Sequence, residues 1–370
     1  MAAFTRTPVT GGGGGSRGGG AYLGREWEHP ADSLLERTRR KYAGHYKSAQ
    51  ADAEKAIDAH LRKNAPKQSS LDNLTDAQHT AFLLALFAGL KWRKTRRAVA
   101  RILYEADSAA TDTVNDAAPE AFAEGANRTL YRFATAPVTG GGGQSRGGGT
   151  GFGSHGDSAN YKPAPYTHAV VLALIDAGLI AAIRRELDRA RDMAWIERRL
   201  QAIAQAEALA HAKIKDMAAA IARRLTASVS GAMDTAAQAT LYGAWDAGMY
   251  EAGEDAARAG WDVEKTWLGI PDSRIRDSHR HLHNTTLPLH ELFHGFAGDL
   301  RYPHDPRAPA AEIMRCRCRL AVHPAGQAPK AFDGLLLPSE TAAYQRWRDA
   351  AIREAGGAFK LYQAHRDGRR

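Results

Sequence analysis

An apolar stripe in the second half of the chain limits most strongly what this sequence can fold into. Apolar side chains recur there with the three- and four-residue spacing of one helix face. They are Ile196, Leu200, Ile203, Ala210, Ile214, Met217, Ile221 and Leu225. Only Glu207 interrupts the stripe with a charge. Because many interface positions are alanine, the pattern favours one long helix packed in a bundle over a free-standing coiled coil.

Further helices are expected on both sides of this stripe. A helix over about 235–257 would carry Leu241, Trp245 and Met249, with Gly248 allowing another backbone to approach. Nearer the N-terminus, Asp32 or Ser33 can cap a helix that runs toward Asn64, and Asn73 or Thr75 can cap the next one. The apolar face of that next helix would consist of Phe82, Leu83, Leu86, Phe87 and Leu90.

Glycine is the anomaly of the composition, with 36 residues in a chain of 370. A Pro-Val-Thr tract rich in glycine at 8–20 recurs at 137–149, with Gln144 in place of Gly15 as the single mismatch. Glycine runs have too much backbone freedom to form regular elements, so both copies are expected to be flexible or looped.

These patterns predict a mainly α protein, with a helical bundle in the N-terminal region and a small α+β C-terminal domain. The expected segments are a Gly-rich flexible N-terminus (1–30), a helical region (31–135), a Gly/Pro-rich linker (136–165), a long-helix bundle region (166–260), a small mixed domain (261–325) and a C-terminal tail with a surface helix (326–370).

A cluster of cations follows the second predicted helix. The six side chains, within eleven residues, are Lys91, Arg93, Lys94, Arg96, Arg97 and Arg101. They form either a solvated helix face or a face that contacts phosphates without reading base sequence. The formal net charge of +9 permits non-specific DNA as a partner. No apolar run reaches 18 residues, so no membrane partner is expected.

The segment 314–322 alternates between Met, Cys, Cys, Leu and Val at even positions and Arg, Arg, Arg and Ala at odd positions. A period of two predicts a half-buried strand with Cys316 and Cys318 inward. Arg315, Arg317 and Arg319 would then form an outward row suited to carboxylate or phosphate.

The small domain also contains an ordered set of motif residues. They are Trp267, Asp272, Arg274, Arg276, His279, Phe293, then Tyr302-Pro303-His304-Asp305-Pro306, and finally Cys316-Arg317-Cys318. In order and spacing this set resembles the C-terminal domain of the phage head-morphogenesis family, the Mu F-like minor head proteins. The resemblance covers about 235–325, and 261–325 would be the Mu F-like domain.

The resemblance implies a portal-associated minor head protein that acts in capsid assembly and in genome packaging or ejection. Its location would be the virion, in the capsid interior or at the portal vertex, after assembly in the host cytoplasm. The implied partners are the portal protein, the major capsid or scaffold protein, and DNA. Proteins of this family look like assembly factors and not enzymes.

We expect the motif side chains to hold the small domain together. Asp272 can form charge-assisted bonds with Arg274 and Arg276, and His279 can close the same network. Metal binding is the alternative, since six histidines lie within 26 residues and two cysteines follow. No cofactor is predicted, and the candidate ligands of a structural zinc ion are His279, His304, Cys316 and Cys318.

A metal-dependent DNA-processing enzyme is the alternative function. It is prompted by the histidine-rich segment, including His281-Leu282-His283-Asn284, which suggests a nuclease of the His-Asn-His type. Against it, Asn284 lies too close to the histidines, and no later histidine lies at a helical i+4 spacing from it. The chain also has no paired carboxylates on a recognisable scaffold. The sequence therefore predicts a protein that is not an enzyme.

Overall fold

The computed structural model describes the helices and the small domain that follows them. The described residues are 29–65, 74–136, 165–166, 171, 192–210, 213–270, 274–327, 342–343, 345–347, 349–350 and 353. Both glycine tracts, most of the predicted linker and most of the predicted tail helix lie outside these ranges.

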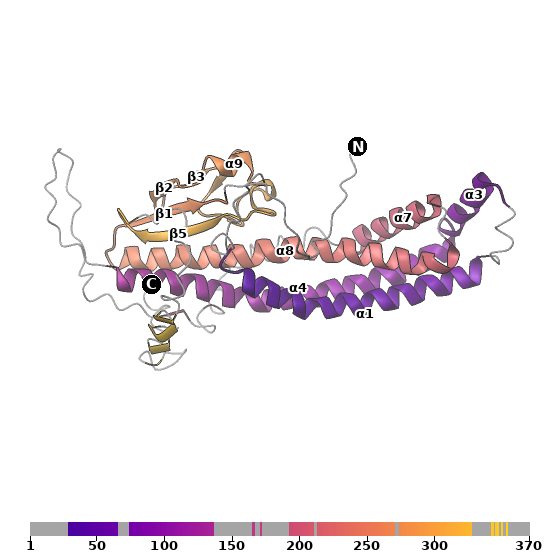
Figure 1. The fold of residues 1–370 in the computed structure, drawn as a ribbon, viewed down its shortest axis with the longest axis horizontal. Coiled ribbons are helices and arrows are strands. Elements are labelled where there is room, and N and C mark those ends of the chain that lie inside the picture. Colours follow the sequence, from indigo (N-terminus) through magenta and orange to yellow (C-terminus); the bar gives the residue numbers. More distant parts are fainter. Residues whose placement is uncertain are drawn as a thin grey trace, which may run out of the picture.

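Long helices form the body of the molecule, which is elongated (Figure 1). The helices of this body are α1 (Asp32–Asn64), α3 (Asp76–Leu86), α4 (Leu90–Thr135), α7 (Met193–Leu209) and α8 (Ile214–Arg258). α1, α4 and α8 run side by side as a three-helix bundle. The fold is mainly α with a small α+β C-terminal domain, which confirms the predicted fold class. Among the described residues, no helix combines the length and hydropathy that crossing a membrane requires.

The helix starts differ in how well they were predicted. Thr75 caps α3 with a full capping box, in which its hydroxyl accepts from the Gln78 amide and the Gln78 side chain accepts from Thr75. α1 ends at Asn64 as expected, but its N-cap is Ala31. Asp32 instead accepts a hydrogen bond from the Tyr242 hydroxyl of α8. Tertiary contact therefore replaces the predicted local cap.

The predicted long helix at 196–225 is wrong, because the chain turns between α7 and α8. Arg224 of α8 pairs with Glu207, and Arg199 of α7 donates to Ser228 at 2.8 Å, so the two helices form an antiparallel hairpin. The turn brings a cation to Glu207, which accounts for the one charge in the apolar stripe. The separate helix predicted at 235–257 is part of α8, with its apolar residues buried as expected.

Two glycines allow α4 and α8 to touch through their backbones. A methyl group on Gly248 would lie 2.1 Å from the carbonyl oxygen of Phe122, and one on Gly125 would lie 2.3 Å from that of Trp245. Any side chain here would force the helices apart. The predicted role of Gly248 is confirmed.

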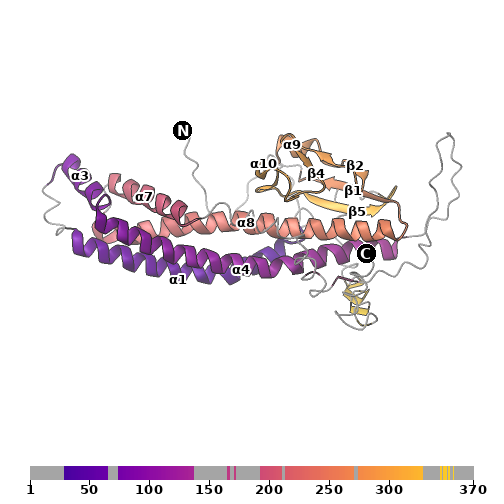
Figure 2. The same cartoon turned by 180° about the vertical axis from the view of Figure 1, so that it is seen from behind.

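The small domain rests on the C-terminal half of α8 (Figures 1 and 2). Its elements are β1 (Val263–Leu268), α9 (Asp277–Arg280), β2 (Thr286–Pro288), β3 (Phe293–His294), β4 (Asp299–Leu300), α10 (Ala310–Ile313) and β5 (Arg319–Pro324). The strands form an antiparallel sheet of order β2-β1-β5 and a β3-β4 hairpin. Lys265 of β1 pairs with Leu287 of β2 and Val322 of β5.

The predicted half-buried strand at 314–322 is wrong in its bounds and in its exposure. β5 starts only at Arg319, after the turn at Met314 and Arg315, where Arg315 has a φ of 56°. All six residues of β5 are buried, and Arg132 of α4 donates to the Val322 carbonyl. The expected outward row of arginines is therefore absent, since Arg315 is exposed, Arg317 half-buried and Arg319 buried.

Candidate functional site in the small domain

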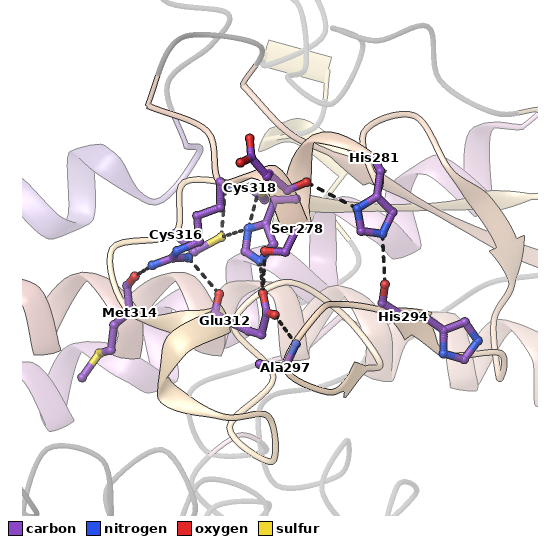
Figure 3. A network of polar contacts seen from close by, with 11 residues as sticks. Ser278, His281, His294, Ala297, Glu312, Met314, Cys316 and Cys318 are labelled. Carbon is purple, nitrogen blue, oxygen red and sulfur yellow. Dashed lines mark hydrogen bonds and ion pairs between the residues drawn. The ribbon is translucent and has the colours of Figure 1, made fainter.

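The polar centre of the small domain brings Glu312, Cys316 and Cys318 close together (Figure 3). The imidazole of His279 contacts all three of them. This imidazole is buried on α9, and Trp267 of β1 meets its ring edge-on with centroids 5.1 Å apart. Its Nε2 lies 2.9 Å from the Glu312 carboxylate of α10. Its Nδ1 faces the sulfurs of Cys316 and Cys318. His279 thus joins three parts of the chain that are distant in sequence.

Glu312 is the acid that holds His279 in place. Its carboxylate also accepts from the Ser278 hydroxyl at 2.9 Å and from the Ala297 amide at 2.8 Å. Burial alone would raise the pKa of Glu312, but these hydrogen bonds and the neighbouring His279 lower it below its ordinary value. The lowered pKa favours the ionised carboxylate, which these three contacts hold in place.

The two cysteines are reduced and buried, each only 3% exposed. His279 Nδ1 lies 3.4 Å from Cys316 Sγ and 3.5 Å from Cys318 Sγ. The Cys318 amide donates to Cys316 Sγ at 3.3 Å. The prediction that both thiols point inward is confirmed, although they precede β5 instead of lying within it.

Only part of the predicted arginine–aspartate network lies among the residues that the structure describes. Asp272 lies outside the described residues. Arg276 donates to the backbone carbonyls of Glu312, at 3.0 Å, and Met314, so it braces the segment that leads to the cysteines. Arg274 is exposed and Arg317 is half-buried.

The Tyr302–Pro306 motif forms a second buried polar unit. Arg301 binds Asp305 through two nitrogens, at 2.9 Å and 3.0 Å, and its amide donates to the same carboxylate. Burial would raise the pKa of Asp305, but Arg301 and the backbone amides of Arg301 and Arg307 lower it to about 2. Tyr302 and Pro303 are buried and Pro306 is half-buried, so the motif serves as a rigid turn.

His304 does not join the other candidate zinc ligands. Its Nδ1 lies 3.1 Å from the Asp246 carboxylate of α8, and its Nε2 lies 3.0 Å from the Cys316 carbonyl oxygen. Burial would lower the pKa of His304, but Cys316 and Asp246 outweigh that effect and raise it. Both ring nitrogens are occupied, so the prediction of His304 as a ligand is wrong. His304 instead docks the small domain onto α8.

The residues that prompted the nuclease alternative have structural partners. His283 Nδ1 accepts from the Gly269 amide at 3.1 Å. Asn284 has a φ of 65°, and its backbone amide donates to the backbone carbonyl of Trp267. His281 stacks on Phe296, with ring centroids 5.1 Å apart. These contacts shape the turn between α9 and β2.

The predicted basic cluster lies at the start of α4. Arg93, Arg97 and Arg101 are exposed and share one face because they are four residues apart. Lys91 and Lys94 are also exposed, but Arg96 binds Glu197 of α7 at 3.3 Å. Among the described residues, no ion pair involves the five exposed cations. Arg96 therefore belongs to the helix contacts, and the other five are open to an anionic partner.

Comparison with models of protein families gave no match, and neither did comparisons with curated proteins and with solved structures. The family resemblance accordingly depends on the motif residues themselves.

Sequence reasoning missed two acids that organise this site. Glu312 and Asp246 are the partners of His279 and His304, and they lie 33 and 58 positions away. Asp246 also accepts from the Leu320 amide at 3.1 Å. The position of Asp246 among apolar residues of the predicted helix at 235–257 was the available signal, since a charge buried there requires a partner. Nothing in the local spacing marks Glu312.

Proposed function

We propose that this chain is a phage minor head protein that binds the portal and acts in capsid assembly and in genome packaging or ejection. Its place would be the virion, in the capsid interior or at the portal vertex. The observation that carries the proposal is the gathering of the motif residues in one small domain. His279, Arg276, Asp305 and the two cysteines all bind groups of that domain. Such a domain is suited to docking.

The helical body supports the same proposal. α4 has 46 residues and α8 has 45, so each spans about 70 Å at 1.5 Å per residue. The small domain occupies one half of α8, and α7 packs near the other end (Figure 2). A long rod with a compact domain on its side can bridge separate partners, as a protein between portal, shell and genome would have to do.

The test is co-expression with the portal protein encoded in the same genome, followed by sedimentation. We expect the chain to migrate with portal rings, while an unrelated portal protein serves as the control and leaves it free. Failure to migrate with the rings would contradict the proposal. DNA cleavage that requires magnesium or zinc and is lost in His279→Ala would favour the enzyme alternative instead.

DNA is proposed as a non-specific partner of the exposed face of α4. Tyr104, 44% exposed, follows Arg101 on this helix and offers a ring beside the cations. Phosphate contacts release counterions, so each one contributes about 0.9 to the slope of log affinity against log salt. Replacing Arg93, Arg97 and Arg101 by Glu should therefore reduce the slope by about 3.

The matched control for DNA binding lies on α1. Lys41, Lys47 and Lys63 are exposed, and their replacement by Glu changes the net charge equally. If both triple variants lose the same affinity, the contact is general charge attraction and not the α4 face. A flat salt response of the unmodified protein would remove DNA from the partners.

A further inference from the structure

The three side chains at the polar centre of the small domain have the arrangement of metal ligands. Nδ1 of His279 and the sulfurs of Cys316 and Cys318 all lie within 4.8 Å of one another. In a tetrahedral zinc site, Zn–S distances near 2.3 Å and Zn–N distances near 2.0 Å place neighbouring ligand atoms about 3.5 Å apart. The two nitrogen–sulfur distances of 3.4 Å and 3.5 Å match that edge.

A hydrogen-bonded cluster explains this arrangement less well. Nε2 of His279 is engaged by the Glu312 carboxylate at 2.9 Å, which leaves only Nδ1 to face the sulfurs. A ring nitrogen offers a single hydrogen-bonding position, as one donor or one acceptor, and so suits one thiol. Both sulfurs nevertheless lie almost equally far from this nitrogen. A metal ion between the three atoms satisfies both sulfurs at once.

The groups around the cluster are of the kind that orient the ligands in metal sites. A carboxylate on the far nitrogen of a ligating histidine fixes its tautomer and orients its ring. Glu312 occupies that position and is itself held by Ser278 and Ala297. The Cys318 amide donates to Cys316 Sγ, as a backbone amide can do for a thiolate. Two of the three ligands, His279 and Cys316, are thus positioned by a second contact.

We propose that His279, Cys316 and Cys318 bind one Zn²⁺ ion, with a water molecule as the fourth ligand. Two thiolates and one imidazole suit zinc, whereas magnesium and calcium prefer oxygen. The ion would tie α9 to the segment that leads into β5, across 37 and 39 positions of sequence. Its role is to stabilise the domain. The site does not depend on the proposed function.

The first test measures metal in the full chain, purified under reducing conditions without chelators. Elemental analysis should find about one zinc per chain. The variant Cys316→Ser/Cys318→Ser should contain none. His281→Ala is the matched control, because this exposed histidine lies two residues from the ligand, and it should retain the metal.

A second measurement keeps the proposal testable if the double variant fails to fold. Cobalt added to metal-free unmodified protein should produce the thiolate charge-transfer and tetrahedral absorption bands, and zinc should abolish them. Glu312→Gln should weaken zinc binding by about 10- to 100-fold, because the imidazole loses its orienting carboxylate. Protein that contains no zinc as purified and shows no cobalt bands would overturn the proposal. So would zinc content unchanged by loss of both cysteines.

Discussion

Along the bundle, α1, α4 and α8 meet mainly through apolar faces that are rich in alanine. The small domain instead places a carboxylate, an imidazole and two thiols at its centre. The bundle distributes its stability over many apolar contacts, each of modest size. The small domain has short strands and helices of four residues, so a few polar side chains contribute much of its stability. Single substitutions should therefore act very differently in the two regions.

The largest effect is expected from Glu312→Ala. The variant leaves Ser278, His279 and the Ala297 amide without their acceptor, and breaking a buried charged network costs about 3–5 kcal/mol. Hydrogen exchange should increase across 263–324, while peptides of α1 stay protected. Glu291→Ala, at an exposed position of the same domain, is the control and should change little. Equal loss of protection in α1 would show that the two regions unfold as one.

Gly248→Ala tests whether the bundle also has a position at which one substitution causes a large loss of stability. The added methyl group meets backbone and cannot be relieved by a side-chain rotation, so we expect a loss of about 3 kcal/mol in urea unfolding. Gly44→Ala is the matched control, because nothing lies within 4 Å of a methyl group there. That variant should gain up to about 1 kcal/mol from helix propensity. Tolerance of alanine at Gly248 would contradict the backbone contact.

Acid should weaken the small domain through Asp305. Its pKa is about 2 in the folded chain, against about 3.9 in an unfolded one, so its ionised form contributes about 2–3 kcal/mol. That contribution is fully present above about pH 5, well above the unfolded-state pKa, and is lost as the pH falls through 4 toward 2. The stability difference between the unmodified protein and Asp305→Asn should therefore shrink between pH 5 and pH 3, measured by hydrogen exchange of β4 and β5. A stability difference that does not change with pH would contradict the lowered pKa of Asp305.

The smallest effect is expected where a charge pair lies within the helical body. Arg224 is 49% exposed on its side chain, so solvent screens its attraction to Glu207. Arg224→Ala should cost about 1 kcal/mol or less, and the loss should decrease with added salt. A larger loss would mean that Glu207 depends on this arginine as strictly as His279 depends on Glu312.

Several features could be predicted because they depend on neighbours in sequence. The capping box at Thr75 needs only Gln78, three residues away, and the buried face of α8 follows from helical spacing. The inward position of Cys316 and Cys318 also followed from alternation. The same alternation gave wrong bounds for β5, because a turn at Arg315 and burial by neighbouring elements override a local period.

The amino-acid sequence alone determined that the chain is mainly helical, that Gly248 meets another backbone, and that two thiols face inward. Only the tertiary structure decided that the chain turns back between α7 and α8, that Glu312 holds His279, and that His304 binds α8. The reason is physical. Periodicity and caps act over one or two helical turns, whereas a buried charge takes whichever partner the packed elements bring to it, however distant in the chain.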